Sequence, residues 1–190
     1  MSLAILSSQR SKDPSTQVGA CIVNKDKRVI GMGYNGLPDG CKDDRFPWGK
    51  AAHECCCECG CGCDECQCSK RRKVEYKWLK DKNFYVCHAE LNAIVNSYGN
   101  SVRGCTVYVT LFPCNECTKL LIQSGIARIV YYSDKHKDRD TTKASKWMLD
   151  YVKVEYTEHK KLDKNIFDMT NEDLKRIVES EDQQDESANN

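Results

Sequence analysis

The chain alternates short apolar runs with polar turns, and these runs predict strands and helices in a regular order. Residues 18–23 are apolar and β-branched, residues 28–34 alternate, and a polar turn separates them, so this part predicts a β-hairpin. Gly31 and Gly33 weaken the second strand and indicate that a backbone or a ligand approaches it closely. Further strands are expected at residues 105–110, 126–132 and 151–156, and helices at residues 88–96, 114–124 and 142–149.

The expected helices differ in their surroundings. Residues 88–96 have little polar face, which predicts a buried helix, and Gly125 closes the helix over residues 114–124. A short N-terminal helix is expected over residues 3–10, with Leu3, Ile5 and Leu6 as its apolar side. The order β-β-α-β-α-β-α-β predicts an α/β protein, a three-layer α/β/α fold with a mixed sheet of about five strands.

A length of 190 residues fits one globular domain followed by a tail. We expect the domain to span residues 1–157 and a C-terminal extension to span residues 158–190. Thr170 as N-cap and Asp173 in the capping-box position predict a terminal helix to Glu179. From Ser180 onward only Ala188 is apolar, so we expect disorder from about residue 180.

Composition excludes several function classes. The 29 basic and 28 acidic residues argue against a large field of one sign for binding nucleic acid or a membrane. The chain contains no run of eighteen apolar residues, so no membrane span is predicted. Residues 1–6 lack the signature of a secretion signal. Thiols persist as metal ligands in a reducing compartment, so the 14 cysteines favour a cytoplasmic protein.

Two cysteines and one histidine have the spacing of metal ligands. Cys114 and Cys117 stand at i and i+3 at the start of a predicted helix, so both thiols share a face, and the helix N-terminus favours the thiolate that zinc needs. His88, at the start of another predicted helix, offers a third ligand. Three protein ligands leave the fourth tetrahedral position of zinc for water, which is typical of a catalytic site.

Glu90 is the candidate acid/base. It follows His88 by two residues, about 200° around an ideal helix, so it is poorly placed to bind the same metal. From the first helical turn its carboxylate can reach the space beside the metal-bound water. Zinc lowers the pKa of that water to about 7, but two thiolate ligands blunt the effect, so a nearby base is needed.

Each half of this pattern is weak alone, because Cys-x-x-Cys is more often a redox pair or half of a structural zinc site. The 22 residues between Glu90 and Pro113 suffice for a helix, a loop and a strand that bring both helix starts together. The combination resembles the zinc deaminase signature H-x-E…P-C-x-x-C. It implies hydrolytic deamination, in which a zinc-bound hydroxide attacks C4 of a cytosine and Glu90 carries the protons.

Longer stretches resemble the deoxycytidylate (dCMP) deaminase family over about residues 5–156, apart from a cysteine-rich block. The matching stretches are RSKDPSTQVGACIVN (10–24), GYNGLPDGCKDD (33–44), PW (47–48), YVCHAELNAIVN (85–96), VYVTLFPCNEC (107–117), IQSGI (122–126) and SDK (133–135). The resemblance implies conversion of dCMP to dUMP, the precursor for thymidylate. It also implies that His88, Cys114 and Cys117 bind Zn²⁺ and that Glu90 is the proton carrier.

The same resemblance implies contacts to the substrate and to effectors. Asn35 should approach the sugar, and the backbone amide of Ala89 should meet the base carbonyl. Lys135 is a candidate phosphate contact, with an ordinary surface lysine as the alternative. Family members are often hexamers that dCTP activates and dTTP inhibits, with Mg²⁺ on the triphosphate, and the loop that contains Asn35 is a candidate part of that regulatory site.

Two features depart from the family pattern. Only nine residues precede Arg10, fewer than the family's first helix needs, so we expect a truncated or misassigned start. The second is an insertion at residues 55–68 with eight thiols in C-x-C and C-x-x-C steps, which favours a second, thiolate-bound metal cluster; the alternative is a disordered low-complexity insertion. Its cysteines are Cys55, Cys56, Cys57, Cys59, Cys61, Cys63, Cys66 and Cys68.

Three other functions fit part of the pattern. One is a deaminase that acts on another cytosine nucleotide, such as dCTP. A deaminase of the same fold that acts on RNA, guanine or a pterin-like ring would lack the long matches at residues 10–24 and 33–44. A non-enzymatic metal-binding module is suggested only by the cysteine block, and it leaves the pairing of His88 and Glu90 with Cys114 and Cys117 unexplained.

Overall fold

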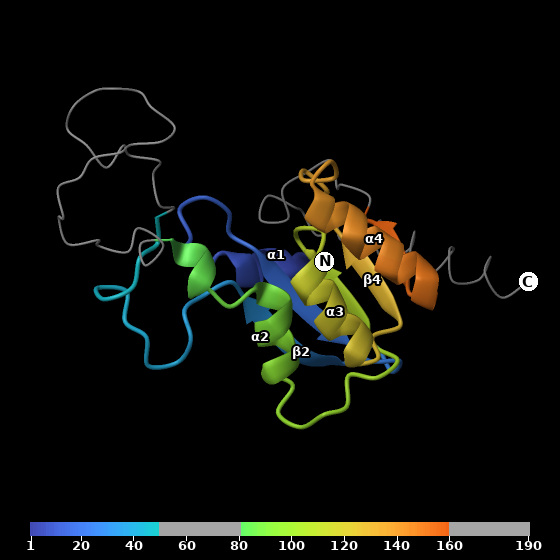
Figure 1. Cartoon of the computed structure of the whole chain (residues 1–190). Coiled ribbons are helices and arrows are strands. Elements are labelled where there is room, and N and C mark those ends of the chain that lie inside the picture. The colour runs from blue at the N-terminus through green and yellow to red at the C-terminus, as the bar shows by residue number, and fades with distance from the viewer. Residues whose placement is uncertain (50–80, 160–190) are drawn as a thin grey trace, which may run out of the picture.

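The computed structural model of the chain describes residues 1–49 and 81–159, and a five-stranded sheet lies at their centre (Figure 1). Its strands, in the order β2-β1-β3-β4-β5, are β1 (Gly19–Val23), β2 (Val29–Tyr34), β3 (Thr106–Val109), β4 (Arg128–Tyr131) and β5 (Glu155–Glu158). β1 is antiparallel to both β2 and β3, whereas β3, β4 and β5 are parallel to one another. The predicted mixed sheet is therefore confirmed.

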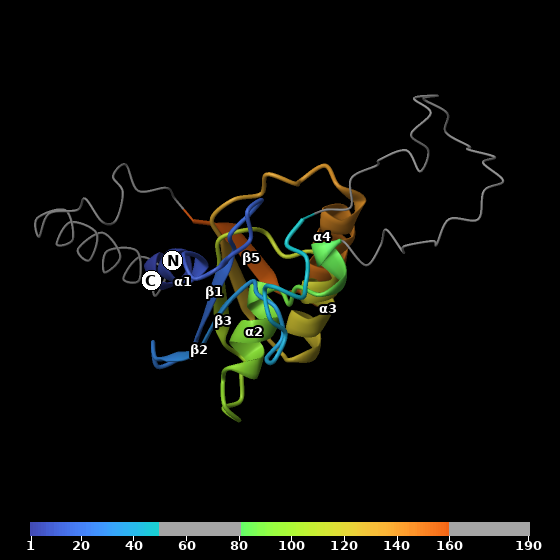
Figure 2. The same ribbon diagram turned by 90° about the vertical axis from the view of Figure 1, so that its left-hand side faces the viewer.

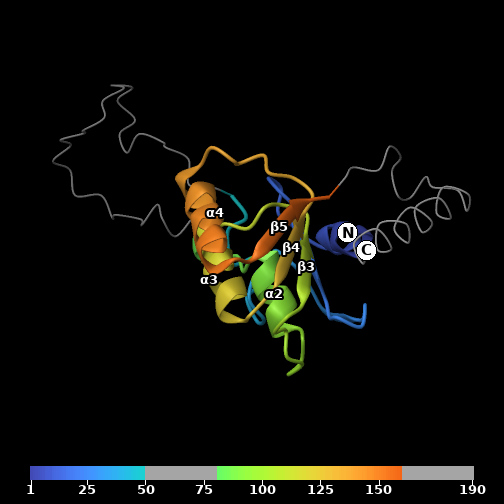
Figure 3. The same ribbon diagram turned by 90° about the vertical axis from the view of Figure 1, so that its right-hand side faces the viewer.

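Helices cover both faces of this sheet. The helical elements are α1 (Ser2–Ser8), the 3₁₀ turn η2 (Lys82–Phe84), α2 (Ala89–Val95), α3 (Asn115–Gln123) and α4 (Asp140–Val152). Figures 2 and 3 show α2, α3 and α4 on one face and α1 on the other, so the three-layer α/β/α prediction is confirmed. None of the described helices has the length and apolar character needed to span a bilayer.

The predicted boundary between the last helix and the last strand is wrong. The helix runs from Asp140 to Val152, and it ends because Lys153 adopts a left-handed backbone with φ 62°. Tyr151 therefore belongs to the helix, although its aromatic side chain and the β-branched residues after it favoured a strand. β5 begins only at Glu155.

The core lies between the sheet and the α2–α4 layer. Its largest fully buried apolar side chains are Ile22, Leu121, Ile129, Leu149, Val107 and Val109. Burying an aliphatic side chain of this size contributes about 1.5–3 kcal/mol to stability, so this layer holds α3 and α4 firmly against the parallel strands.

Glycine lets α2 approach the sheet closely, as predicted. A Cβ atom on Gly33 would lie 2.3 Å from the carbonyl oxygen of Ala89 and 2.3 Å from the amide nitrogen of Ala93. Only a narrow face of α2 is buried in this contact, and Val95 is 66% exposed. The prediction of a buried helix is therefore confirmed for the face toward the sheet only, because contact between two backbones buries small residues and leaves the outer face more exposed.

The packing of α1 also differs from the prediction. Leu3 and Leu6 are 43% and 50% exposed, whereas Ala4 and Ser7 are buried. A Cβ atom on Gly19 would lie 2.0 Å from the carbonyl oxygen of Ala4, so the helix meets β1 through small residues. The apolar side expected from the sequence is therefore the outer side of α1.

Replacing Gly33 with Ala tests this close packing. The added methyl group meets backbone atoms that cannot rotate away, so we expect a loss of stability of about 2–3 kcal/mol. Thermal unfolding measures the change. The matched control is Gly49→Ala, because among residues 1–49 and 81–159 a Cβ atom there has no neighbour within 4 Å. Equal melting temperatures for the two variants would contradict this account of how α2 is positioned.

Candidate active site

The first turns of α2 and α3 bring three candidate metal ligands together. His88 is the N-cap of α2 and Cys114 is the N-cap of α3, and both have extended backbone before their helix begins. Nδ1 of His88 lies 3.3 Å from Sγ of Cys117 and 3.4 Å from Sγ of Cys114. Cys114 and Cys117 follow His88 by 26 and 29 positions in the sequence, and the fold brings their donor atoms together.

This donor set fits zinc. The ligand atoms of His88, Cys114 and Cys117 all lie within 4.8 Å of one another. A tetrahedral zinc ion with bonds of about 2.0–2.3 Å separates its ligand atoms by roughly 3.3–3.8 Å, so the two shorter separations match. Cys117 is buried, Cys114 is partly exposed and His88 is exposed, so the trio is closed on one side and open on the other.

Among these three side chains alone, negative charge collects on Cys114. Hydrogen bonds from Cys117 and then from His88 lower the pKa of Cys114 to about 3, against the opposing effect of burial. The bond to Cys114 raises the pKa of His88 to about 9, and together with burial it raises the pKa of Cys117. A divalent cation takes the place of the protons held in this way, so metal binding here releases protons.

Glu90 lies beside this trio, as the second residue of α2. It is only 4% exposed, and its carboxyl group is in hydrogen-bond contact with the thiol of Cys117. Burial raises the pKa of Glu90, and the charge of His88 opposes this effect. His88 precedes the helix, with φ −74° and ψ 157°, so the helical angle expected between these two residues does not apply. Glu90 nevertheless sits next to the donor atoms.

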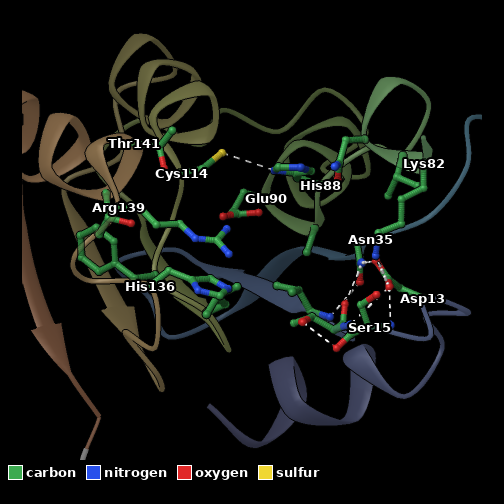
Figure 4. A pocket seen from close by; sticks show the side chains of 18 residues that line it. Asp13, Ser15, Asn35, Lys82, His88, Glu90, Cys114, His136, Arg139 and Thr141 are labelled. Atoms are coloured by element: carbon green, nitrogen blue, oxygen red, sulfur yellow. Dashed lines mark hydrogen bonds and ion pairs between the residues drawn. The ribbon is translucent and has the colours of Figure 1, made fainter. Parts of the chain in front are cut away.

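A cavity of about 410 Å³ opens in front of these residues (Figure 4). Figure 4 shows three groups around it: His88, Glu90 and Cys114 in the centre; His136, Arg139 and Thr141 on the side of α4; and Asp13, Ser15, Asn35 and Lys82 opposite. All ten line the cavity. A buried carboxyl group, two of the three candidate metal ligands and a basic wall therefore line one cavity.

A protein-family model described as the cytidine and deoxycytidylate deaminase zinc-binding region matches residues 1–133. The chain belongs to the cytidine and deoxycytidylate deaminase family. A probable deoxycytidylate deaminase of Drosophila melanogaster is 50% identical over 159 residues, which cover 84% of this chain and 70% of the fly protein. Deoxycytidylate deaminase of Homo sapiens is 46% identical over 156 residues, which cover 82% of this chain and 75% of the human protein.

A solved structure shares the fold. The dCMP deaminase from the cyanophage S-TIM5, in complex with dCMP and dUMP, is 26% identical and superposes with a TM-score of 0.56. The match covers 82% of this chain and 90% of the phage chain. The cytidine deaminase-like fold expected from the sequence is therefore confirmed.

Two of the three predicted substrate contacts line the cavity of this deaminase. Ala89 is fully buried, and its amide lies in the first turn of α2, where helix amides lack intrahelical acceptors. Asn35 is 6% exposed and uses its side chain to hold a loop, since Oδ1 accepts from the amide of Val18 at 2.8 Å. Lys135 is exposed and outside the cavity lining; its Nζ donates to Oγ1 of Thr16 at 2.9 Å.

Sequence reasoning missed Arg139 and His136. The apolar pattern placed the start of the last helix at Thr142, whereas α4 begins at Asp140, and this shift makes Arg139 its N-cap. A basic residue at the N-terminus of a helix that faces a cavity is a signal for anion binding. That signal emerges only when the helix boundary is known to within one residue.

The remaining predictions lie outside the described residues. They are the cysteine block at residues 55–68, the helix at residues 170–179 and the disordered tail from about residue 180. The predicted domain boundary at residue 157 falls inside β5, which continues to Glu158.

Proposed function

We propose that this chain hydrolyses dCMP to dUMP and ammonia at a zinc centre, and so supplies dUMP for thymidylate synthesis. The observation that carries the proposal is the cluster of His88, Cys114 and Cys117 next to Glu90, at a cavity whose wall on the side of α4 is basic. Relatives 45–50% identical that bear the name deoxycytidylate deaminase support the choice of substrate.

In this proposal His88, Cys114 and Cys117 hold the zinc ion. Zinc, when bound, supplies a Lewis acid that lowers the pKa of a water molecule at its fourth position. Glu90 takes the proton of the attacking water, delivers a proton to N3 of the cytosine and then helps the amine leave as ammonia. The amide of Ala89 donates to the base carbonyl and so holds C4 in front of Glu90.

The basic wall binds the phosphate. Arg139 extends from the start of α4 toward the middle of the cavity (Figure 4), and among residues 1–49 and 81–159 it forms no ion pair. His136 lies beside it, and the N-terminus of α4 adds a positive dipole. Asn35, on the opposite side of the cavity, faces the sugar. Lys135 remains a predicted phosphate contact. Its Nζ donates to Oγ1 of Thr16, which lines the cavity.

Replacing Arg139 with Ala tests the phosphate role. A hydrogen bond to a charged group is worth about 1.5–3 kcal/mol, so we expect KM for dCMP to rise roughly tenfold to a hundredfold. Deoxycytidine lacks the phosphate, and its kcat/KM should change little. Steady-state kinetics on both substrates measure the effect. The control is Arg128→Ala. Arg128 is an exposed residue at the start of β4, and it pairs with Glu155. Equal losses on both substrates would contradict the assignment.

A substrate panel tests the proposed function itself. Zinc-replete protein is incubated with dCMP, dCTP, deoxycytidine and CMP, and the loss of cytosine absorbance is followed. We expect dCMP to have the highest kcat/KM. Preference for dCTP would favour the other nucleotide deaminase, and no turnover of any of the four would defeat the proposal.

The cysteine insertion carries a separate proposal. Its eight thiols bind additional soft metal ions, which supply folding energy that this apolar-poor segment lacks. Native mass spectrometry counts the metal ions. More than one zinc ion per chain would support the proposal, and a single zinc ion per chain would contradict it.

Assembly and regulation rest on the family resemblance. We expect a cytoplasmic hexamer that dCTP activates and dTTP inhibits, with Mg²⁺ on the triphosphate. Light scattering with and without dCTP and Mg²⁺, together with rates at low dCMP concentration, tests this. A monomer whose rate responds to neither nucleotide would contradict both expectations.

A further inference from the structure

Lys82 and Asp13 form an ion pair inside the cavity wall, although they are 69 positions apart in the sequence. Their side chains are each only 6% exposed. Two charges removed from water are costly unless they pair and find further hydrogen bonds. An ion pair buried in the wall of the cavity therefore points to a role in shaping that wall.

Asp13 uses its remaining lone pairs to fold the loop that follows it. Oδ1 accepts from the amides of Ser15 at 2.8 Å and Thr16 at 3.2 Å, and Oδ2 accepts from the amide group of Asn35 at 3.0 Å. Asn35 in turn accepts from the amide of Val18 at 2.8 Å. All four of these partners line the cavity, so one carboxylate shapes this wall (Figure 4).

The network keeps Asp13 charged. Burial by itself would raise the pKa of Asp13, but the hydrogen bond from Lys82 and the amides of Ser15 and Thr16 outweigh burial and lower it. A carboxylate in this position repels an anionic nucleotide unless its charge is balanced. Lys82, which lines the same wall as Asp13, supplies the balancing charge.

We propose that Lys82 is a positioning residue: its ammonium group holds and neutralises Asp13, so that the loop at residues 13–18 and Asn35 keep the shape that receives a nucleotide monophosphate. Lys82 acts through Asp13 and does not itself transfer a proton. The kinetic part of this inference rests on the proposed function, whereas the part that concerns the loop does not.

Lys82 also ties this wall to the chain on either side of the cysteine-rich segment. Its amide donates to the carbonyl oxygen of Gly49 at 2.9 Å, so residues 49 and 82 are held together at the same place where Asp13 is held. Residue 82 is thus in contact both with Gly49 and with Asp13, at the start of the loop at residues 13–18.

The test is Lys82→Met, compared with Lys82→Arg, which keeps the charge. Hydrogen–deuterium exchange of the peptide that covers residues 13–18 reports on the loop without any substrate. We expect exchange there to become at least about tenfold faster in Lys82→Met, while peptides of β3 and α3 keep the parent rates. KM for dCMP should rise about tenfold with kcat within roughly threefold of the parent, and Lys82→Arg should recover most of both losses.

A matched control and a second variant keep the outcome clear. Lys119→Met removes an exposed lysine that pairs with Glu116, and it should change neither readout. If Lys82→Met does not fold, the double variant Asp13→Asn, Lys82→Met leaves no unpaired buried charge. The amide introduced at position 13 has one acceptor oxygen where the carboxylate has two, so it cannot hold both the loop amides and Asn35. Exchange at residues 15–18 should therefore again be faster.

Parent-like exchange at residues 13–18 in Lys82→Met, or in the double variant where the single one does not fold, would overturn the proposal. A fall in kcat with KM unchanged would also overturn it, because that result assigns Lys82 to the chemical step or to the fold in general. If the parent protein does not turn over dCMP, the proposed function fails, and the exchange experiment still decides the role of Lys82.

Discussion

Replacing Glu90 with Gln is expected to lower kcat for dCMP by about 10³-fold, since general acid–base catalysis is worth about 10²–10⁴. Glutamine has nearly the same size and still fills the buried space at the start of α2. It cannot accept the proton of the attacking water or return a proton to the base. Initial rates measure the loss, and metal analysis should find the zinc content of the parent.

The matched control for this variant is Glu116→Gln. Glu116 lies in the first turn of α3, as Glu90 lies in the first turn of α2, but it is exposed and pairs with Lys119. Its replacement should leave kcat near the parent value. Near-normal turnover by the Glu90 variant would remove this residue from the mechanism.

Replacing Cys117 with Ser is expected to cost the chain one zinc ion and at least about 10³-fold in activity. A serine hydroxyl is a hard and largely protonated donor, and zinc in such sites prefers the soft thiolate. Because Cys117 is 4% exposed, water cannot easily take its place as a ligand. Metal analysis of the purified variant and of the parent gives the difference in zinc per chain.

The control for the Cys117 variant is Cys105→Ser. Cys105 is equally buried, at 3% exposed, but lies in the apolar core, away from the candidate ligands. This variant should lose some stability and keep its zinc. Added zinc should restore activity to the parent protein after chelation but not to the Cys117 variant. Full activity in the Cys117 variant would contradict the proposed ligand set.

Local patterns predicted the parts of this molecule that depend on neighbouring residues. The starts of α2 and α3 could be placed from His88-Ala-Glu90 and Pro113-Cys114, because a helix start is defined by a few residues. Gly31 and Gly33 indicated that a backbone or a ligand approaches closely, and the order of strands and helices then predicted the layers of the fold.

Contacts between distant segments could not be predicted in the same way. The pairing of Asp13 with Lys82 depends on how two loops meet, and no local pattern records it. Leu3 and Leu6 belong to the apolar side that the sequence indicates, but they face outward, because a helix that packs backbone to backbone buries its small residues. Arg139 was not predicted as a site residue because its place at the start of α4 depends on a helix boundary. Boundaries are the least reliable part of a prediction from sequence.

The central claim is that this chain hydrolyses dCMP to dUMP and ammonia at a zinc site beside the cavity. Isotope labelling tests this claim most directly. Zinc-replete protein is incubated with dCMP in H₂¹⁸O, and the product is analysed by mass spectrometry together with an ammonia assay. We expect dUMP that carries one ¹⁸O atom at C4 and one ammonia per dUMP formed, with no product from the Glu90→Gln variant on the same timescale. Recovery of unchanged dCMP, or of dUMP without the label, would contradict the claim.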